Sequence, residues 1–140
     1  MGVSTLKRRA AALAALLILG GCEKPAPAGG ASGDKFAGLD GAILQWRQDI
    51  IAADPLCKAT AEDQKCSGFE VACKAERTVT AADQAKGVTA RVVGLLTWTG
   101  FDPKFKQSQS ASLTAEFSKT AQGWTRASHG PVNPQSCADL

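Results

Sequence analysis

The apolar residues of this 140-residue chain change their spacing once, and this change limits the fold more than any other feature. Over residues 36–54 they recur at steps of three and four, which is the spacing of one face of an α-helix. This stripe consists of Phe36, Leu39, Ile43, Trp46 and Ile50. Beyond residue 68 apolar residues alternate with polar ones, as in strands with one buried face. A helix with a single apolar stripe must pack on such a sheet or on another helix.

Two residues set the expected ends of this helix. The carboxylate of Asp34 can accept a hydrogen bond from a backbone N–H of the first turn, so Asp34 is the predicted N-cap. Pro55 disfavours helical backbone geometry at Asp54, so the helix is predicted to end there.

Four later segments are predicted to be strands. Residues 69–79 alternate, with Phe69, Val71, Cys73, Ala75 and Val79 pointing inward and Glu70, Lys74, Glu76 and Thr78 pointing outward. Residues 88–101 are apolar on both faces and predict the central strand. Residues 110–119 alternate again, and residues 124–128 return as a short fourth strand after a turn at Gly123.

Because the helix precedes the strands, we predict an α+β fold with a single domain over residues 36–140. One N-terminal helix packs on an antiparallel meander of about four strands. This layout is similar to that of cystatin-like and NTF2-like domains in exported lipoproteins.

The N-terminal residues carry an export pattern. Lys7, Arg8 and Arg9 precede an apolar run from Ala10 to Leu19, which is too short to span a bilayer as a helix. A basic start, a short apolar segment and small residues are typical of a cleaved signal. The run ends in Leu19-Gly20-Gly21-Cys22.

This ending resembles the lipobox of bacterial lipoproteins, and the resemblance implies three things. Residues 1–21 are the signal peptide, Cys22 carries a thioether-linked diacylglycerol, and its new amino group takes a further acyl chain such as palmitate. Several chains are needed because one acyl chain gives only marginal membrane binding. Glu23, where an inner-membrane retention signal has Asp, favours the outer membrane, with the domain facing the periplasm.

Residues 22–35 are predicted to be the lipidated cysteine and a flexible tether, because they are rich in Pro, Ala, Gly and Ser. Thirteen such residues span roughly 20 Å on average. Lys7, Arg8 and Arg9 account for the whole formal net charge of +3, so the processed chain is neutral. A neutral domain lacks the basic patch that nucleic-acid binding requires, and we exclude that function.

The cysteines left after lipidation of Cys22 are Cys57, Cys66, Cys73 and Cys137. An even number in an exported domain predicts two disulfides. We favour Cys57–Cys66, which closes the loop after the helix, with Cys73–Cys137, which holds the tail across the sheet. Cys57–Cys73 with Cys66–Cys137 is the alternative. The spacing lacks the close pairs of a zinc site, so no metal is predicted.

The sequence offers few groups for catalysis. His129 lies in a loop with Gly and Pro, where we expect an exposed side chain, and no serine lies in a Gly-x-Ser-x-Gly elbow. Glu70 and Glu76 share the outer face of one predicted strand but lie too far apart for a glycosidase pair. We therefore predict a protein that is not an enzyme and has no cofactor.

Two surfaces are candidates for contact with a partner. The first is a hairpin tip within residues 100–109, where Asp102-Pro103 starts a turn and the candidate contact residues are Phe101, Lys104, Phe105 and Lys106. The alternative for Phe105 is that it folds back onto the core. The second is the outer face of the central strand, formed by Arg91, Val93, Leu95, Thr97 and Thr99. A groove ligand, a second protomer or the tail held by Cys137 would cover it.

These observations predict a membrane-anchored envelope lipoprotein that acts as a non-catalytic binding or assembly accessory module, with the membrane and an envelope protein as partners. The alternative is an inhibitor of a periplasmic or secreted hydrolase, with the loop from Asp102 to Lys106 placed in the enzyme cleft.

Replacement of Cys22 by serine should leave an unprocessed precursor, because serine has no thiol for lipid attachment. The measurement is the intact mass of protein extracted from membranes. A Cys22→Ser chain that is processed to the normal lipidated mass would contradict the lipobox assignment.

Overall fold

The computed structural model describes residues 34–140, so Cys22 and most of the predicted tether lie outside the described residues. The chain order is α1 (Leu39–Ala53), the 3₁₀ turns η1 (Pro55–Cys57) and η2 (Glu62–Gln64), β1 (Ser67–Arg77), α2 (Ala81–Ala85), β2 (Ala90–Asp102), β3 (Gln107–Thr120) and β4 (Gly123–Ser128). The strands form one antiparallel sheet in the order β1-β2-β3-β4. The predicted α+β meander with one main helix is confirmed.

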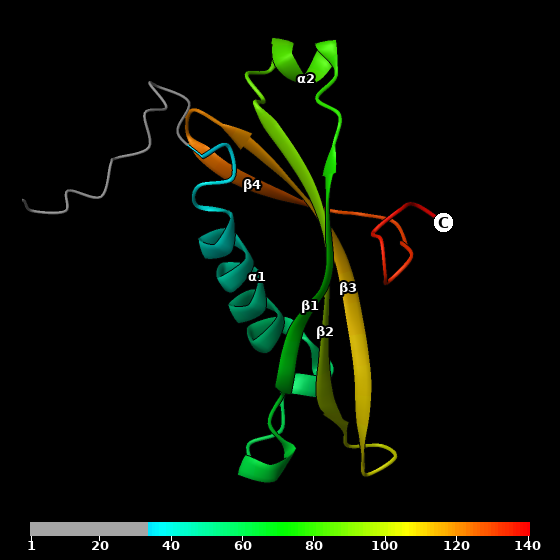
Figure 1. The fold of residues 1–140 in the computed structure, drawn as a ribbon. Coiled ribbons are helices and arrows are strands. Elements are labelled where there is room, and N and C mark those ends of the chain that lie inside the picture. Colours follow the sequence, from blue (N-terminus) through cyan, green and yellow to red (C-terminus); the bar gives the residue numbers. More distant parts are fainter. Residues whose placement is uncertain (1–33) are drawn as a thin grey trace, which may run out of the picture. The chain divides into compact units, whose positions relative to one another are not determined.

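Helix α1 covers one face of the sheet (Figure 1). Its buried residues Leu39, Trp46 and Ile50 pack against β2 and β3, and the partly buried Phe36 and Ile43 complete the predicted stripe. The sheet contributes Val92, Leu96, Trp98, Ala115 and Phe117 to this core. The rings of Trp46 and Phe117 meet edge to face at 5.6 Å, a favourable arrangement for aromatic pairs.

The C-terminal end of α1 is where the sequence predicts it, but its N-terminal end is not. Pro55 ends the helix as expected, because Asp54 is extended, and the Asp54 carboxylate accepts a hydrogen bond from the Leu56 N–H at 2.8 Å. The prediction of Asp34 as N-cap is wrong. Gly38 is the N-cap, with φ of 85°, and Asp34 instead accepts from the Phe36 N–H in a separate turn. Glycine takes this left-handed conformation without the steric cost that a side chain brings.

Strand β1 does not keep one set of side chains on one face. A register shift lies between Val71, which pairs with Leu96, and Cys73, which pairs with Leu95. This bulge inserts one extra residue and moves every later side chain to the opposite face. Phe69 and Val71 therefore pack on the α1 side, whereas Cys73 and Ala75 pack on the other side. The prediction that all of them point one way is wrong.

The same bulge separates the two glutamates of β1. Glu76 lies on the α1 side, where its carboxylate pairs with Lys35 at 2.6 Å. Glu70 precedes the bulge and points to the opposite face, because it is the neighbour of Val71. The two carboxylates do not share a face, contrary to the expectation from simple alternation.

The short helix α2 between β1 and β2 was not predicted. Its N-cap Thr80 and Asp83 form a capping box, in which each side chain accepts a hydrogen bond from the other residue's backbone N–H. The Thr-Ala-Ala-Asp spacing is the signal that would have identified this helix.

Loss of the Trp98 side chain should harm the packing of the sheet against α1. Trp98 is 2 % exposed, and its ring stacks on Phe69 at 5.8 Å. Trp98→Ala should lower the free energy of unfolding by about 3–5 kcal/mol, because it leaves a large cavity under α1. Urea unfolding followed by circular dichroism measures this.

Trp98→Phe is the matched control. It keeps an aromatic ring and removes a buried indole N–H that has no acceptor among the described residues. This variant should be far less destabilised than Trp98→Ala. Equal losses would show that ring packing does not hold this face together.

Candidate functional site

The tip of the β2–β3 hairpin is shorter than residues 100–109, because β2 continues to Asp102 and β3 begins at Gln107. The Asp102 carboxylate accepts hydrogen bonds from the N–H groups of Lys104, at 2.8 Å, and Phe105, at 3.2 Å. These bonds fix the turn from its first residue. Lys106 completes it with φ of 52°.

Three of the four candidate contact residues lie at this tip and point into solvent. Phe105 is 63 % exposed, so the alternative in which it folds onto the core is wrong. The Lys104 ammonium lies 5.2 Å from the centre of the Phe105 ring, and Lys104 and Lys106 are exposed. Phe101 is half-buried at the end of β2 and does not belong to the tip. The tip therefore presents one aromatic ring between two cations.

The loop that the Cys57–Cys66 disulfide closes lies next to the end of the β2–β3 hairpin, at Phe101 and Pro103. Gly100 in β2 allows this loop and the preceding η1 turn to come close, because a Cβ there would meet the Leu56 Cβ at 2.5 Å and the Cys66 Sγ at 3.1 Å. Phe101 and Pro103 form one wall of a depression of about 300 Å³ against this loop. The other lining residues are Pro55, Lys58, Ala59, Thr60, Ala61 and Gln64.

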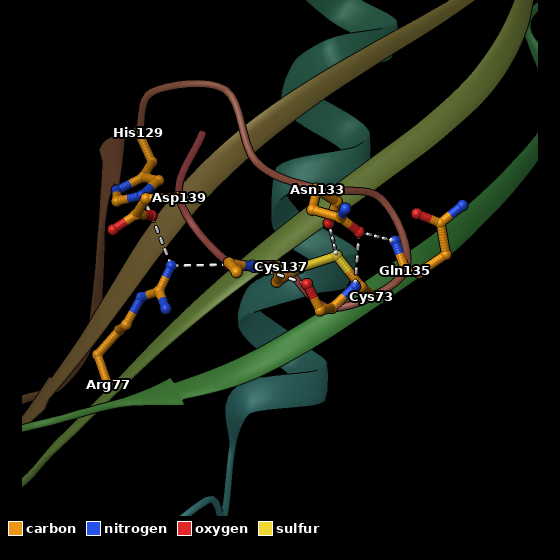
Figure 2. The surroundings of a disulfide bond; sticks show 9 residues. Cys73, Arg77, His129, Asn133, Gln135, Cys137 and Asp139 are labelled. Atoms are coloured by element: carbon orange, nitrogen blue, oxygen red, sulfur yellow. Dashed lines mark hydrogen bonds and ion pairs between the residues drawn. A yellow bond between two sulfur atoms is a disulfide. The ribbon is translucent and has the colours of Figure 1, made fainter.

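The second candidate surface, the outer face of β2, is covered by the C-terminal tail. A disulfide joins Cys73 in β1 to Cys137, so the favoured cysteine pairing is confirmed. Val93, Leu95, Val132 and Cys137 form a second buried cluster on this face. Figure 2 shows the tail crossing the strands on the side opposite α1. The chain's own tail, rather than a ligand or a protomer, therefore covers Val93 and Leu95.

His129 belongs to this tail and is not the exposed loop residue that we expected. Its side chain is 21 % exposed and lies between two carboxylates. Its Nε2 is 2.8 Å from Oδ1 of Asp139, and its Nδ1 is 3.7 Å from Oε2 of Glu116. Figure 2 shows His129 next to Asp139. Arg77 donates to Asp139 at 2.6 Å and to the Cys137 carbonyl at 2.7 Å. The cluster ties the tail to β1 and β3.

Charge pairing continues from this cluster across the sheet. Arg91 binds Glu116 at 2.8 Å and Asp83 at 3.0 Å. The hydrogen bond to Glu116 is the main cause of the raised pKa of Arg91. The hydroxyl of Thr80 is the main cause of the lowered pKa of Asp83. These groups were not predicted because the tail and α2, which bring them together, leave no periodic pattern.

A third surface, a groove of about 320 Å³ between α1 and β3–β4, was also not predicted. Trp46, Ile50 and Leu113 give it apolar walls, and Leu113 is 47 % exposed. Asp49 and Arg126 form an ion pair at 2.9 Å beside it. A hydrogen bond from Gln45, with a second from Arg126, lowers the pKa of Asp49. The groove holds one charge pair and no convergent set of titratable groups for catalysis among its lining residues.

No family model, curated protein or solved structure matches the chain. Within residues 34–140 no group of three or more His, Cys, Asp or Glu side chains is arranged to hold a metal ion. No helix in the described part of the chain is long and apolar enough to cross a membrane.

The Asp139 contacts predict how the tail responds to acid. The hydrogen bond with His129, followed by the charge of Arg77, lowers the pKa of Asp139 below its ordinary value of 3.8. A lowered folded-state pKa stabilises the fold above 3.8, and this stabilisation is lost as the pH falls through the folded-state value. Asp139→Asn should therefore be less stable than the native chain at pH 6, and the difference should shrink towards pH 2.5.

Urea midpoints measured across this pH range check the Asp139 prediction. Asp63→Asn, in the exposed η2 turn, is the charge-matched control. If the urea midpoints of the native chain and Asp139→Asn differ by the same amount at every pH, the Asp139 prediction is wrong.

Proposed function

We propose that this protein is a lipid-anchored envelope lipoprotein whose domain is a non-catalytic binding module, with the tip of the β2–β3 hairpin as its contact surface. The observation that carries the proposal is Phe105, which is 63 % exposed at a turn whose backbone is fixed by Asp102. An exposed aromatic side chain is a typical anchor in binding surfaces. A fixed backbone reduces the entropy lost on binding.

The anchor part of the proposal rests on the sequence Leu19-Gly20-Gly21-Cys22 behind a short apolar run. The two disulfides of the domain agree with an oxidising compartment. In this proposal the lipid on Cys22 and the following tether hold the domain near the outer membrane, on the periplasmic side. The tip then meets a partner protein of the envelope.

A second candidate is an inhibitor of a periplasmic or secreted hydrolase. The observation in its favour concerns the base of the hairpin tip. Gly100 lies close to Leu56 there, beside the loop that the Cys57–Cys66 disulfide closes. A loop held in one conformation suits insertion into an enzyme cleft. The domain added in stoichiometric amounts should then lower the activity of a lysozyme or protease, and Phe105→Ser should abolish this effect.

Phe105→Ser should weaken binding of envelope partners about tenfold or more, which corresponds to about 1.4 kcal/mol or more of binding free energy, and should lower the recovery of cross-linked partners. The measurement is chemical cross-linking in membranes, followed by purification of the full chain and mass spectrometry. Leu44→Ser is the matched control, because Leu44 is similarly exposed, at 59 %, but lies on α1. Equal recovery with both variants would exclude the tip as the contact surface.

Intact mass tests the anchor separately. The membrane-extracted protein should have the mass of residues 22–140 plus acyl chains and should gain four hydrogens on reduction of its two disulfides. A mass that starts at Met1, with the thiols already free, would contradict both the anchor and the compartment.

A further inference from the structure

Strand β3 leaves half of its outer edge open. It runs from Gln107 to Thr120, but β4 pairs only with its residues from Ala115 onward. The last contact on that side is the hydrogen bond from the His129 N–H to the Thr114 carbonyl, at 3.3 Å. Residues 107–113 therefore pair with β2 on one side and with no strand of the described chain on the other.

The backbone groups that face outward on this edge are defined by the Thr114 contact. In an antiparallel sheet the N–H and C=O of one residue point to the same side, and alternate residues point to opposite sides. Because the Thr114 carbonyl points towards β4, the N–H and C=O groups of Ser112, Ser110 and Ser108 point to the open edge. All three serines are exposed.

This edge lacks the features that protect the opposite edge of the sheet. β1 carries charged residues, among them Lys74 and Arg77, and two register shifts that distort its edge. Natural proteins use such charges, bulges and prolines to prevent pairing between molecules. The β3 segment Gln-Ser-Gln-Ser-Ala-Ser-Leu, residues 107–113, has no charge, no proline and no register shift against β2.

We infer that the open edge of β3 pairs with the same edge of a second copy of this chain. The segment is bounded by the turn residue Lys106 at one end and by the His129 contact at the other. Antiparallel self-pairing that fills residues 107–113 places Ser110 opposite Ser110 on a two-fold axis. Ser108 then pairs with Ser112 of the second copy, and about six backbone hydrogen bonds join the two sheets.

The charges near the edge agree with a second copy as the occupant. The paired segments carry no charge, so no like charges oppose each other along the new strand pair. At each end, Lys106 of one copy meets the point where the His129 N–H already binds the Thr114 carbonyl of the other, so the pairing stops there. Two residues further along the same face lies Glu116, in the cluster that includes the 65 % exposed Asp139. A cation is thus placed beside carboxylates at both ends of the symmetric contact.

Single cysteines on the edge test the pairing and its register. Opposed residues of a hydrogen-bonded pair lie about 5.5 Å apart at Cα, a distance that a disulfide can bridge. With copper–phenanthroline as oxidant, full-length Ser110→Cys in membranes and in detergent should form a covalent dimer. Ser108→Cys alone and Ser112→Cys alone should not, because their equivalent residues are offset by about 14 Å. A mixture of these two variants should cross-link.

The wild-type chain, which has the same five native cysteines, gives the background for this experiment. Ser110→Cys at background level would overturn the inference, and so would self-linking of Ser108→Cys or Ser112→Cys at the Ser110→Cys level. Cross-linking of Ser110→Cys to a different protein would also overturn it and would assign the edge to an extended segment of that partner.

Ser110→Pro provides a second test that does not depend on cysteine chemistry. The Ser110 N–H points to the open edge, so proline there removes no hydrogen bond to β2. Sedimentation of the full chain in detergent should show a dimer whose fraction falls at least tenfold in this variant, with an unchanged circular dichroism spectrum. A native chain that stays monomeric at all concentrations would contradict the inference.

Discussion

The structure depends on a central strand with two apolar faces. β2 directs Val92, Leu96 and Trp98 to one side and Val93 and Leu95 to the other. Because burial of apolar side chains is the main driving force of folding, each face needs its own cover. Helix α1 supplies one cover, and the tail from His129 onward supplies the other (Figure 1). The bulge in β1 gives each face apolar side chains from the same strand.

The two covers are held by different interactions. α1 has a continuous apolar stripe and is retained by packing, so its position follows from residues that recur along the sequence. The tail, residues 129–140, has one bridge between Val132 and Asp139 and no helix or strand of its own. A disulfide and the charged contacts of Arg77 and His129 hold it in place. A segment without secondary structure needs such specific links because it buries little apolar area.

Much of this fold could be predicted from sequence, and the errors have physical causes. Apolar patterns predicted α1 and the four strands, and Pro55 predicted the end of the helix, because each of these signals lies within a few neighbouring residues. The bulge after Val71 was missed, because alternation continues through Ala72, a small residue that fits either face. The partners of His129 were missed because Glu116 and Asp139 meet only through the path of the tail. The open edge of β3 depends on where β4 ends, which sequence patterns define poorly.

Cys73 and Cys137 lie 64 residues apart, and three strands and α2 separate them along the chain. The face under α1 needs residues only as far as Phe117 for its buried core, whereas the face under the tail also needs Val132 and Cys137. A chain whose tail is not yet in place would therefore expose Val93 and Leu95 in an otherwise assembled sheet. Because Cys137 lies so late in the chain, formation of the Cys73–Cys137 disulfide is a late step in folding. Before this step only the α1 face of the sheet is covered, and after it both faces are covered.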